Sequence, residues 1–358
     1  MSTHSDDLIL TDRTTGEVDN QCGMKRWWYK EHDGTGIVPV VEEEFFEVGR
    51  EIHEDFNRLH AGESFALLVG EIQTDLEGTQ DQFLLERSYR RMGWLAAYAL
   101  FRLDKEKEAG ETLLLEAEYS LNRDPLIIAC TPDRVWRRYL DKRVIYREYK
   151  SCKSASWGWA HHWPKAIQLH VGIKALQEEF PDWNITQGEV MGLVKGDVKW
   201  GKLMHPYVWS YWAEPDEWIP IGQAQGRRDL TLRPVWEYNG GIIEWVKKCG
   251  AEIAASQFPF SAPIYLDDRL LNAYVTARQH REREVQFYRS QAQVDMEQRY
   301  QYFRPNFDQC IPVIGRQCPY LEACHNATVN RDPLRSGLYK PRTPHHELEM
   351  IWRDEEVE

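Results

Sequence analysis

The chain has 358 residues, of which 42% are hydrophobic and 28% are charged, and its formal net charge is −13 at pH 7. This composition predicts a folded, soluble protein. No apolar run of about 18 residues is present, which argues against a membrane span. The polar, acidic first 20 residues lack the apolar segment of a secretory signal. The acidic balance argues mildly against tight, non-specific binding to duplex DNA, although basic stretches remain, as at 134–143.

The apolar pattern changes from helical to strand-like and back along the chain. Steps of three and four predict amphipathic helices over 41–59 and 80–106. Short β-rich runs separated by turn residues then predict a meander of strands over 113–121, 125–130, 132–136 and 143–151. The remaining expected elements are a helix over 162–180, strands over 188–196 and 207–213, a helix within 231–255 that begins after Pro234, and a long charged helix over 267–302. This order predicts a mixed α/β (α+β) fold with a central sheet of mixed direction.

The segment 131–153 carries the most informative group of polar residues. Asp133 follows a proline at the start of one predicted strand, and Glu148 and Lys150 lie two apart on the next. Side chains two apart share a strand face, so these two converge while Tyr149 faces the other side. If the strands pair as a hairpin, Asp133 comes to lie beside Glu148. Two carboxylates can hold a hard divalent cation for phosphodiester hydrolysis, with the lysine beside the attacking water. A surface aspartate and an ordinary Glu–Lys pair remain the alternative.

Two flanking residues belong to the same hypothesis. His53 follows the apolar Ile52 on the first helix and is expected at the edge of its buried face. Gln168 lies on the helix after the Glu–Lys strand. Taken alone, each has a simpler interpretation, as a structural histidine and a surface glutamine.

In this order, Gly49-Arg-Glu-Ile-His53, Pro132-Asp133, Glu148-Tyr-Lys150 and Gln168 resemble the motifs of the RecB-like PD-(D/E)XK nucleases. That family includes CRISPR-associated and bacteriophage exonucleases. The resemblance implies a restriction-endonuclease-like core in which Lys150 is the catalytic lysine. It implies that Mg²⁺ or Mn²⁺ is held by His53, Asp133, Glu148 and a carbonyl near Tyr149.

Two further positions bear on this resemblance. Gln168 would match the glutamine of the family's Q-x3-Y motif, but Gly172 stands where that motif has tyrosine. Glu118, on the strand expected before Asp133, would match an acidic residue often found there.

Seven cysteines, an odd number, without a secretory signal predict a reducing cytoplasm rather than disulfides. The resemblance implies that this is the cytoplasm of a bacterial or phage-infected cell. Three of the cysteines cluster as Cys310-x7-Cys318-x5-Cys324. A soft metal ion or an iron–sulfur cluster uses four thiolates. The residues alone leave the fourth open among Cys22, Cys130, Cys152 and Cys249.

The family resemblance favours Cys22 as the fourth ligand, around a [4Fe–4S] cluster. The x7 gap is longer than that common in helicase-linked members, so Zn²⁺ remains the alternative. Cys22 and Cys310 are 288 positions apart. A metal site joining them would hold the two ends of the chain against the nuclease core, because it removes the entropy of closing a long loop.

The expected organisation has five parts. They are a flexible lead (1–20), an N-terminal helical part with the first cluster cysteine (21–112), the nuclease core (113–230), a C-terminal helical part with three cluster cysteines (231–330) and an exposed tail (331–358).

Fifteen tryptophans are a high count, and Trp157 and Trp159 follow Lys150 in a loop expected at the mouth of the site. Aromatic faces suit single-stranded DNA because stacking tolerates any base, although core packing explains most tryptophans. The resemblance implies a metal-dependent DNA exonuclease that acts on single strands or DNA ends, alone or with a recombination or repair protein. The alternatives are a nucleic-acid-binding accessory or adaptation factor that cleaves little, and a zinc-stabilised structural protein.

Overall fold

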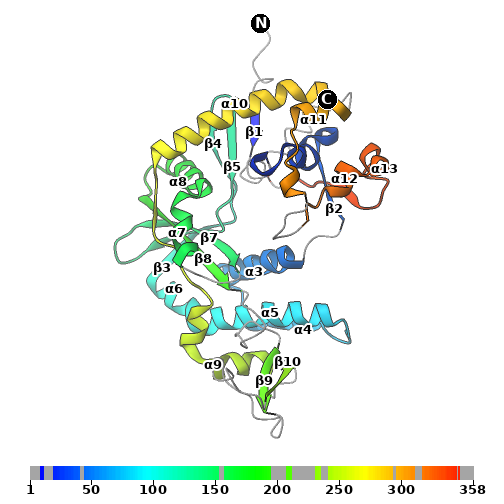
Figure 1. Cartoon of the computed structure of the whole chain (residues 1–358). Helices are drawn as coiled ribbons and strands as arrows, with labels where there is room; N and C mark the ends of the chain where they lie inside the picture. Colours follow the sequence, from blue (N-terminus) through cyan, green and yellow to red (C-terminus); the bar gives the residue numbers. More distant parts are fainter. Residues whose placement is uncertain are drawn as a thin grey trace.

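The structure, a computed structural model, describes residues 9–11, 19–40, 44–152, 157–194, 207–211, 230–234, 241–292, 296–310, 317–344 and 346. It is a mixed α/β fold in which helices flank the sheets, as predicted. Figure 1 shows the long helix α10 (Asp268–Ala292) across the top of the molecule, with the main sheet below one end and the cysteine-bearing C-terminal part below the other.

The N-terminal third is helical, as expected. Its elements are α3 (Glu44–Ala61), α4 (Phe65–Asp75), α5 (Gln82–Tyr98), η3 (Ala99–Leu103) and α6 (Asp104–Ala109). The apolar pattern did not predict α4. Its N-terminal signal is Ser64, whose hydroxyl accepts a hydrogen bond from the Leu67 N–H, and Asp81 caps α5 in the same way.

The main sheet has five strands in the order β11-β8-β7-β6-β3. Their bounds are Ile264–Tyr265, Ile185–Val194, Val144–Cys152, Arg134–Arg138 and Gly110–Leu115. The predicted hairpin is confirmed, because β6 and β7 pair antiparallel with Arg134 opposite Arg147. Strands β7 and β8 are parallel. The chain crosses between them through α7 (Trp157–His162), η4 (Trp163–Lys165) and α8 (Ile167–Glu179).

The single strand expected over 113–121 is wrong. It is two strands, β3 and β4 (Tyr119–Arg123), which belong to different sheets. Glu116 lies between them with a φ of +43°, a left-handed conformation that turns the chain. Strand β4 pairs with β5 (Leu126–Cys130), and β5 pairs with β1 (Ile9–Thr11).

Both faces of the main sheet are covered. On one face, Tyr149 of β7 packs with Phe56 of α3 and with Trp245 of α9 (Gly241–Ser256). On the other face, Tyr146 of β7 packs with Leu169 of α8. Strand β8 is buried on both faces in the same way, with Met191 and Leu193 in the first core and Val190 in the second, which explains its apolar end.

The C-terminal third contains the expected helices and one strand pair. Strand β9 (Tyr207–Tyr211) pairs antiparallel with β10 (Leu230–Pro234), which the sequence analysis did not identify. The helix expected over 267–302 is present as α10 and α11 (Met296–Tyr302), and residues 293–295 between them lie outside the described part of the chain. Three short elements follow, η7 (Phe307–Gln309), α12 (Leu321–His325) and α13 (Ala327–Arg331).

A separate core joins the two ends of the chain. Near the N-terminus it comprises α2 (Gly23–Arg26), η1 (Trp27–Glu31), η2 (His32–Gly34) and β2 (Ile37–Pro39). The buried Trp27 and Trp28 pack here with Phe303, Tyr320 and Tyr339.

The exposed tail expected after residue 330 is wrong for part of its length. Strand β12 (Tyr339–Pro341) pairs with β2, and the Tyr339 side chain is only 4% exposed. Arg342 is also buried, donates from Nε to the Thr35 carbonyl and lies over the Tyr29 ring. A strand pair and a buried guanidinium therefore fix this segment against the N-terminal part.

Buried ion pairs attach the N-terminal segment to α10. The Arg26 guanidinium contacts Glu31 at 2.9 Å and Glu282 of α10 at 2.6 Å. Arg278 contacts the same Glu282 carboxylate, and Arg289 contacts Glu31 at 2.7 Å. Because buried ions must be paired, this network specifies where the N-terminal segment docks.

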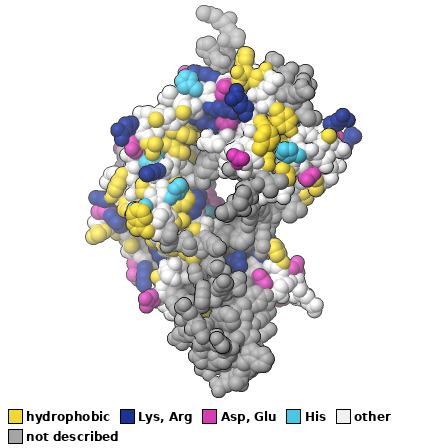
Figure 2. Space-filling view, viewed as in Figure 1, with side chains coloured by type: hydrophobic (Ala, Val, Ile, Leu, Met, Phe, Trp, Pro, Cys, Tyr) yellow, Lys and Arg dark blue, Asp and Glu magenta, His cyan; other side chains and the backbone are white. Residues whose placement is uncertain are grey.

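The helices and the surface charges have two further features. Within the described ranges, no helix combines the length and apolar character needed to cross a membrane. On the face shown in Figure 2, Lys and Arg side chains are interspersed with Asp and Glu.

The Arg26–Glu282 pair makes a testable contribution to stability. Burial alone would raise the pKa of Glu282, but Arg26 and Arg278 lower the pKa to about 2. Since an exposed glutamate has a pKa of about 4.3, ionised Glu282 stabilises the fold above that pH, and the contribution is lost as the pH falls towards 2. We expect Glu282→Gln to lower the free energy of unfolding at pH 7 by about 3–5 kcal/mol, measured by urea denaturation.

Glu284→Gln is the matched control, because Glu284 lies on the same helix in a half-exposed pair with Arg281. It should change the free energy of unfolding by less than about 1 kcal/mol. Equal effects of the two substitutions would contradict a structural role for the buried pair.

Candidate functional site

The β6–β7 hairpin brings the sequence-predicted acidic residues and lysine together. Asp133 immediately precedes β6, and Glu148 and Lys150 lie on β7. Glu148 shares the strand face of Tyr146, whereas Tyr149 points into the opposite core, where its ring meets Phe56 edge to face at 5.5 Å. The predicted division of β7 into two faces is confirmed.

The Asp133 carboxylate is held from two elements. One oxygen accepts a hydrogen bond from the Tyr149 N–H at 2.5 Å, and the other lies 3.5 Å from Nδ1 of His53 on α3. The His53 ring also meets the Tyr149 ring edge to face at 5.6 Å. Burial alone would raise the pKa of Asp133, but His53 and then Lys150 lower it below the usual value. The site therefore favours an ionised carboxylate.

The Glu148 carboxylate is 2% exposed and both of its oxygens are bonded. Oε1 accepts a hydrogen bond from the Tyr146 hydroxyl at 2.6 Å, and Oε2 accepts one from Lys150 Nζ at 2.8 Å. Lys150 and Glu148 therefore form a direct ion pair inside the site. Tyr146 was not singled out from the sequence, where it looked like an ordinary strand aromatic.

These side chains open onto one cavity of about 350 Å³. Its lining comprises His53, Ile128, Ala129, Cys130, Thr131, Asp133, Tyr146, Glu148, Lys150, Ile167, Gln168, Val171, Tyr274 and His346. Four of the residues expected to act together, His53, Asp133, Glu148 and Lys150, thus share a cavity with Gln168. The Oε1 atom of Gln168 is buried without a hydrogen-bond partner among the described residues.

The departure from the Q-x3-Y motif has a steric basis. A Cβ atom added at Gly172 would lie 2.4 Å from Cε2 and 2.8 Å from the hydroxyl oxygen of Tyr146. Real Cβ atoms do not approach other atoms so closely, so α8 can pack on β7 here only with glycine. The Tyr146 ring fills the space beside Gly172, and its hydroxyl is the group that reaches Glu148.

The acidic residue near Asp133 differs from the expected one. Glu118 lies in the β3–β4 connection, not on a strand, and pairs with His346 at 3.4 Å. Glu116 in the same connection is within electrostatic reach of Asp133 and His53, because burial and Asp133 raise its pKa while His53 lowers it. Glu116 and Glu118 lie off the strands because the chain breaks between β3 and β4. The sequence pattern did not predict this break.

The donor set fits the chemistry of a hard divalent cation. Carboxylate oxygens from Asp133 and Glu148 and an imidazole nitrogen from His53 are groups that Mg²⁺ or Mn²⁺ accepts, and the buried Gln168 oxygen is a further acceptor. In the part of the chain that the structure describes, no group of three or more His, Cys, Asp and Glu residues is arranged to hold a metal ion. The acidic side chains are instead bonded to Tyr146, Lys150, the Tyr149 amide and His53.

The four cysteines expected to form the second metal site come from both ends of the chain. Cys22 directly precedes α2, and its sulfur accepts a hydrogen bond from the Asn306 N–H at 3.2 Å. The Cys310 carbonyl accepts from the Cys318 N–H at 3.0 Å. The Cys324 sulfur accepts from the Trp28 indole N–H at 3.1 Å. The contacts of Cys22 and Cys324 link the N-terminal and C-terminal segments, and the Cys310–Cys318 bond lies within the C-terminal segment.

The thiols also influence one another. Burial raises the pKa of Cys310, and Cys318 and Cys22 raise it further. Burial raises the pKa of Cys324 to about 12. The hydrogen bond from Trp28 lowers this pKa, and Cys318, Cys22 and Cys310 raise it. Cys22, Cys310, Cys318 and Cys324 therefore lie within electrostatic reach of one another.

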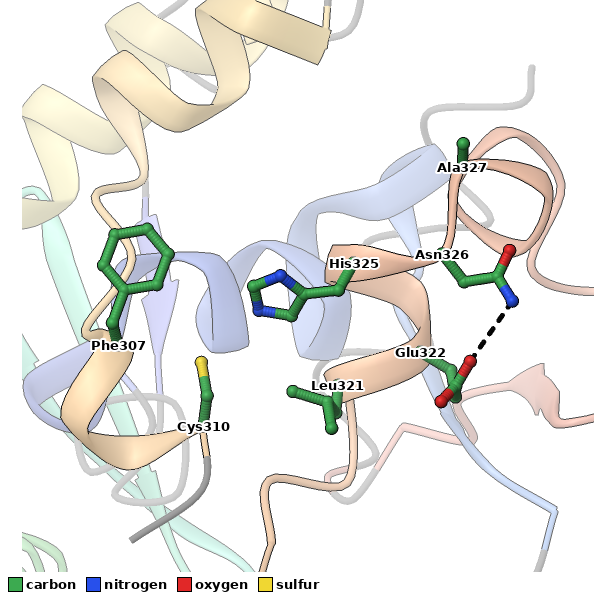
Figure 3. Close-up of a pocket in the computed structure, with 7 residues that line it drawn as sticks. All are labelled: Phe307, Cys310, Leu321, Glu322, His325, Asn326 and Ala327. Atoms are coloured by element: carbon green, nitrogen blue, oxygen red, sulfur yellow. Dashed lines mark hydrogen bonds between the residues drawn. The ribbon is translucent and has the colours of Figure 1, made fainter.

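A surface hollow adjoins this cluster. Figure 3 shows the His325 ring pointing toward Phe307 and Cys310, and the two rings are 6.3 Å apart. Asn326 donates to the Glu322 carboxylate at 3.3 Å on the far side of the hollow.

The other three cysteines lie elsewhere. Cys130 lines the carboxylate cavity, Cys152 ends β7 and Cys249 lies on α9. All seven cysteines are free thiols in the structure.

The loop expected to carry Trp157 and Trp159 is a helix, α7. Trp157 is 77% exposed and its ring stacks on His161 at 4.1 Å. Trp159 instead packs into the core beside Gly192 and meets Trp163 edge to face at 5.9 Å. The rings of Trp157 and His161 can stack because the two residues lie four apart on a helix. Trp157 is therefore exposed, whereas Trp159 contributes to the core.

Neither a protein-family model nor a curated protein matches this sequence.

The close packing of Gly172 against Tyr146 can be tested with alanine. In an ordinary helix interior, Gly→Ala stabilises by about 0.5–1 kcal/mol. We expect Gly172→Ala to lower the free energy of unfolding by about 1–3 kcal/mol instead, because the new methyl group overlaps the Tyr146 ring. Thermal and urea denaturation measure the change.

Gly70→Ala is the matched control, because Gly70 lies on α4 and an added Cβ there meets nothing within 4 Å. It should be neutral or stabilising. A stabilised Gly172→Ala variant would show that Tyr146 can move and is not fixed against α8.

Proposed function

We propose that this chain is a divalent-metal-dependent deoxyribonuclease that hydrolyses phosphodiester bonds. The observation that carries the proposal is the convergence of His53, Asp133, Glu148 and Lys150 on one cavity. They come from α3, the start of β6 and β7, so residues nearly one hundred positions apart meet at one place. Unrelated surface residues would not be expected to line one cavity with their charges paired.

The reaction would divide the work among these residues. Mg²⁺ or Mn²⁺ bound through Asp133, Glu148 and His53, with a carbonyl near Tyr149, would supply Lewis-acid activation of water and phosphate. His53 and the Tyr149 N–H orient the Asp133 carboxylate, and Tyr146 orients Glu148. As the water oxygen bonds to phosphorus and the bond to the leaving oxygen breaks, the Lys150 ammonium would offset the added negative charge.

Gln168 has a supporting role in this proposal. Its side-chain oxygen is buried beside the acidic residues with no hydrogen-bond partner among the described residues. Burying an acceptor without a partner is costly. A water molecule or a substrate hydrogen-bond donor in the cavity would satisfy it, as a catalytic role requires.

The substrate we favour is single-stranded DNA or a DNA end. The exposed Trp157–His161 stack offers a surface on which a base can lie without sequence preference. The acidic net charge and the interspersed charges of Figure 2 favour a strand held by stacking over a duplex held along a basic face.

We further propose that Cys22, Cys310, Cys318 and Cys324 hold a [4Fe–4S] cluster, with Zn²⁺ as the alternative. The mutual influence of their thiols and the contacts between the two terminal segments support this assignment. The cluster would fasten the ends of the chain. A nuclease of this kind would act in the reducing cytoplasm of a bacterial or phage-infected cell, in recombination, repair or phage DNA processing.

Lys150→Ala tests the proposed reaction. We expect the purified protein with Mn²⁺ to digest labelled single-stranded DNA, and the substitution to lower kcat about 100-fold or more, because the ammonium beside Glu148 is lost. Lys142→Ala is the control, since Lys142 lies in the exposed β6–β7 turn. Gel electrophoresis of the products measures the rate.

Two results would count against this mechanism. Digestion that survives Lys150→Ala would remove the role of the lysine. No digestion with any divalent metal, together with retained DNA binding, would favour the accessory or adaptation factor that cleaves little.

Cys22→Ser tests the terminal metal site. Anaerobically purified wild-type protein should be brown, with a broad visible absorbance band. We expect Cys22→Ser to lose most of that band, because one of four thiolates is removed. Cys249→Ser, which lies in a different core on α9, should keep it.

Metal analysis separates the alternatives. A colourless wild-type protein with one bound zinc would exclude the iron–sulfur cluster. It would leave the proposal that a metal site fastens the two ends of the chain. Equal metal content in Cys22→Ser and wild type would show that Cys22 is not a ligand.

A further inference from the structure

One residue of the C-terminal segment lies at the carboxylate cavity. His346 lines that cavity together with Lys150 and Gln168, although almost 180 positions separate it from Gln168. Composition and pattern gave no reason to place a residue of the tail there.

The chain is anchored shortly before His346. Strand β12 pairs with β2, and the buried Arg342 donates to the carbonyl of Thr35 from Nε and to that of Gly36 from its backbone N–H. Only four positions separate Arg342 from His346. The anchored segment therefore limits how far the histidine can move from the cavity.

Glu118 pairs with the His346 ring. The Glu118 carboxylate lies 3.4 Å from His346 Nδ1, and the side chains are 17% and 14% exposed. Glu118 also contributes to raising the pKa of the buried Cys130 thiol, which lines the same cavity. The pair thus lies at the cavity rather than on the outer surface.

The cavity has two kinds of wall. The charged groups described above form one part. Another part is apolar or aromatic, and it includes Ile128, Ala129, Ile167, Val171, Tyr274 and His346. Tyr274 belongs to α10 and His346 lies in the segment after β12, so both of these rings come from outside the main sheet.

We propose that His346 is a substrate-positioning residue, and that with Tyr274 it forms the wall on which the base and sugar of the nucleotide beside the scissile phosphate pack. This inference rests on the proposed nuclease function and extends it. A nucleotide has a charged end and a planar aromatic end, and the cavity offers a metal-binding set beside an aromatic wall. Histidine and tyrosine rings are both faces on which unstacked bases lie.

The proposed stacking role of His346 differs from a catalytic role. The carboxylates and Lys150 act on the phosphate, whereas His346 would act on binding of the adjacent base. Its removal should therefore raise KM more than it lowers kcat, by about tenfold for loss of one stacking contact. Because stacking needs only a planar ring, phenylalanine should replace histidine.

The experiment compares three variants, His346→Ala, His346→Phe and the surface control His280→Ala, which lies exposed on α10. Each is assayed with Mn²⁺ on an oligothymidylate and on an abasic oligomer of the same length. With the oligothymidylate, His346→Ala should raise KM about tenfold, and His346→Phe and His280→Ala should stay within about twofold of wild type. With the abasic oligomer, which has no base to stack, His346→Ala and wild type should have nearly equal KM values.

A KM increase of equal size on both oligomers would overturn the proposal, because it would indicate a merely structural effect of the tail. Failure of His346→Phe to restore binding would overturn it as well, and so would an unchanged KM in His346→Ala. If wild type cleaves neither oligomer, the nuclease proposal fails separately. Dissociation constants for the two oligomers in Ca²⁺, measured by fluorescence anisotropy, then decide the role of His346 by the same pattern.

Discussion

The position of the Asp133 carboxylate is the constraint on which the rest of the site depends. Asp133 lies immediately before β6, its side chain is only 14% exposed, and it is held by the backbone of β7 and the imidazole of α3. A buried carboxylate is costly unless it is paired and hydrogen-bonded. The hairpin register and the docking of α3 on the sheet must therefore both be correct before the charged groups can meet. Glu148, Lys150 and Tyr146 then follow from the alternation of β7.

The two ends of the chain are joined by contacts that do not depend on this site. The Arg26–Glu282 pair docks the N-terminal segment on α10, and strand β12 docks the C-terminal segment on β2. The four terminal cysteines lie in the same region, and His346 extends from it to the cavity. A structural metal site there would therefore influence the cavity through the tail, without touching the reacting groups.

Much of the fold and the central residues of the site could be predicted from the sequence. The helical periods identified α3, α5 and α10, and the β-rich runs identified β5 to β8, because local patterns report burial directly. The same-face relation of Glu148 and Lys150 follows from strand geometry. The break at Glu116, the strand β10 and the buried Tyr339 and Arg342 could not be predicted, since they depend on a left-handed residue or on partners far along the chain. Tyr146 and His346 were missed for the same reason: their roles arise from packing against Gly172 and pairing with Glu118.

Binding of Mn²⁺, followed by electron paramagnetic resonance of the free ion, tests the convergence of the acidic residues most directly. Wild type should remove Mn²⁺ from solution at one site of highest affinity. Asp133→Asn and Glu148→Gln should each abolish that binding, while Glu252→Gln on the exposed side of α9 should leave it intact. Retention of the same affinity in either site variant would contradict the view that the two carboxylates hold a common ion.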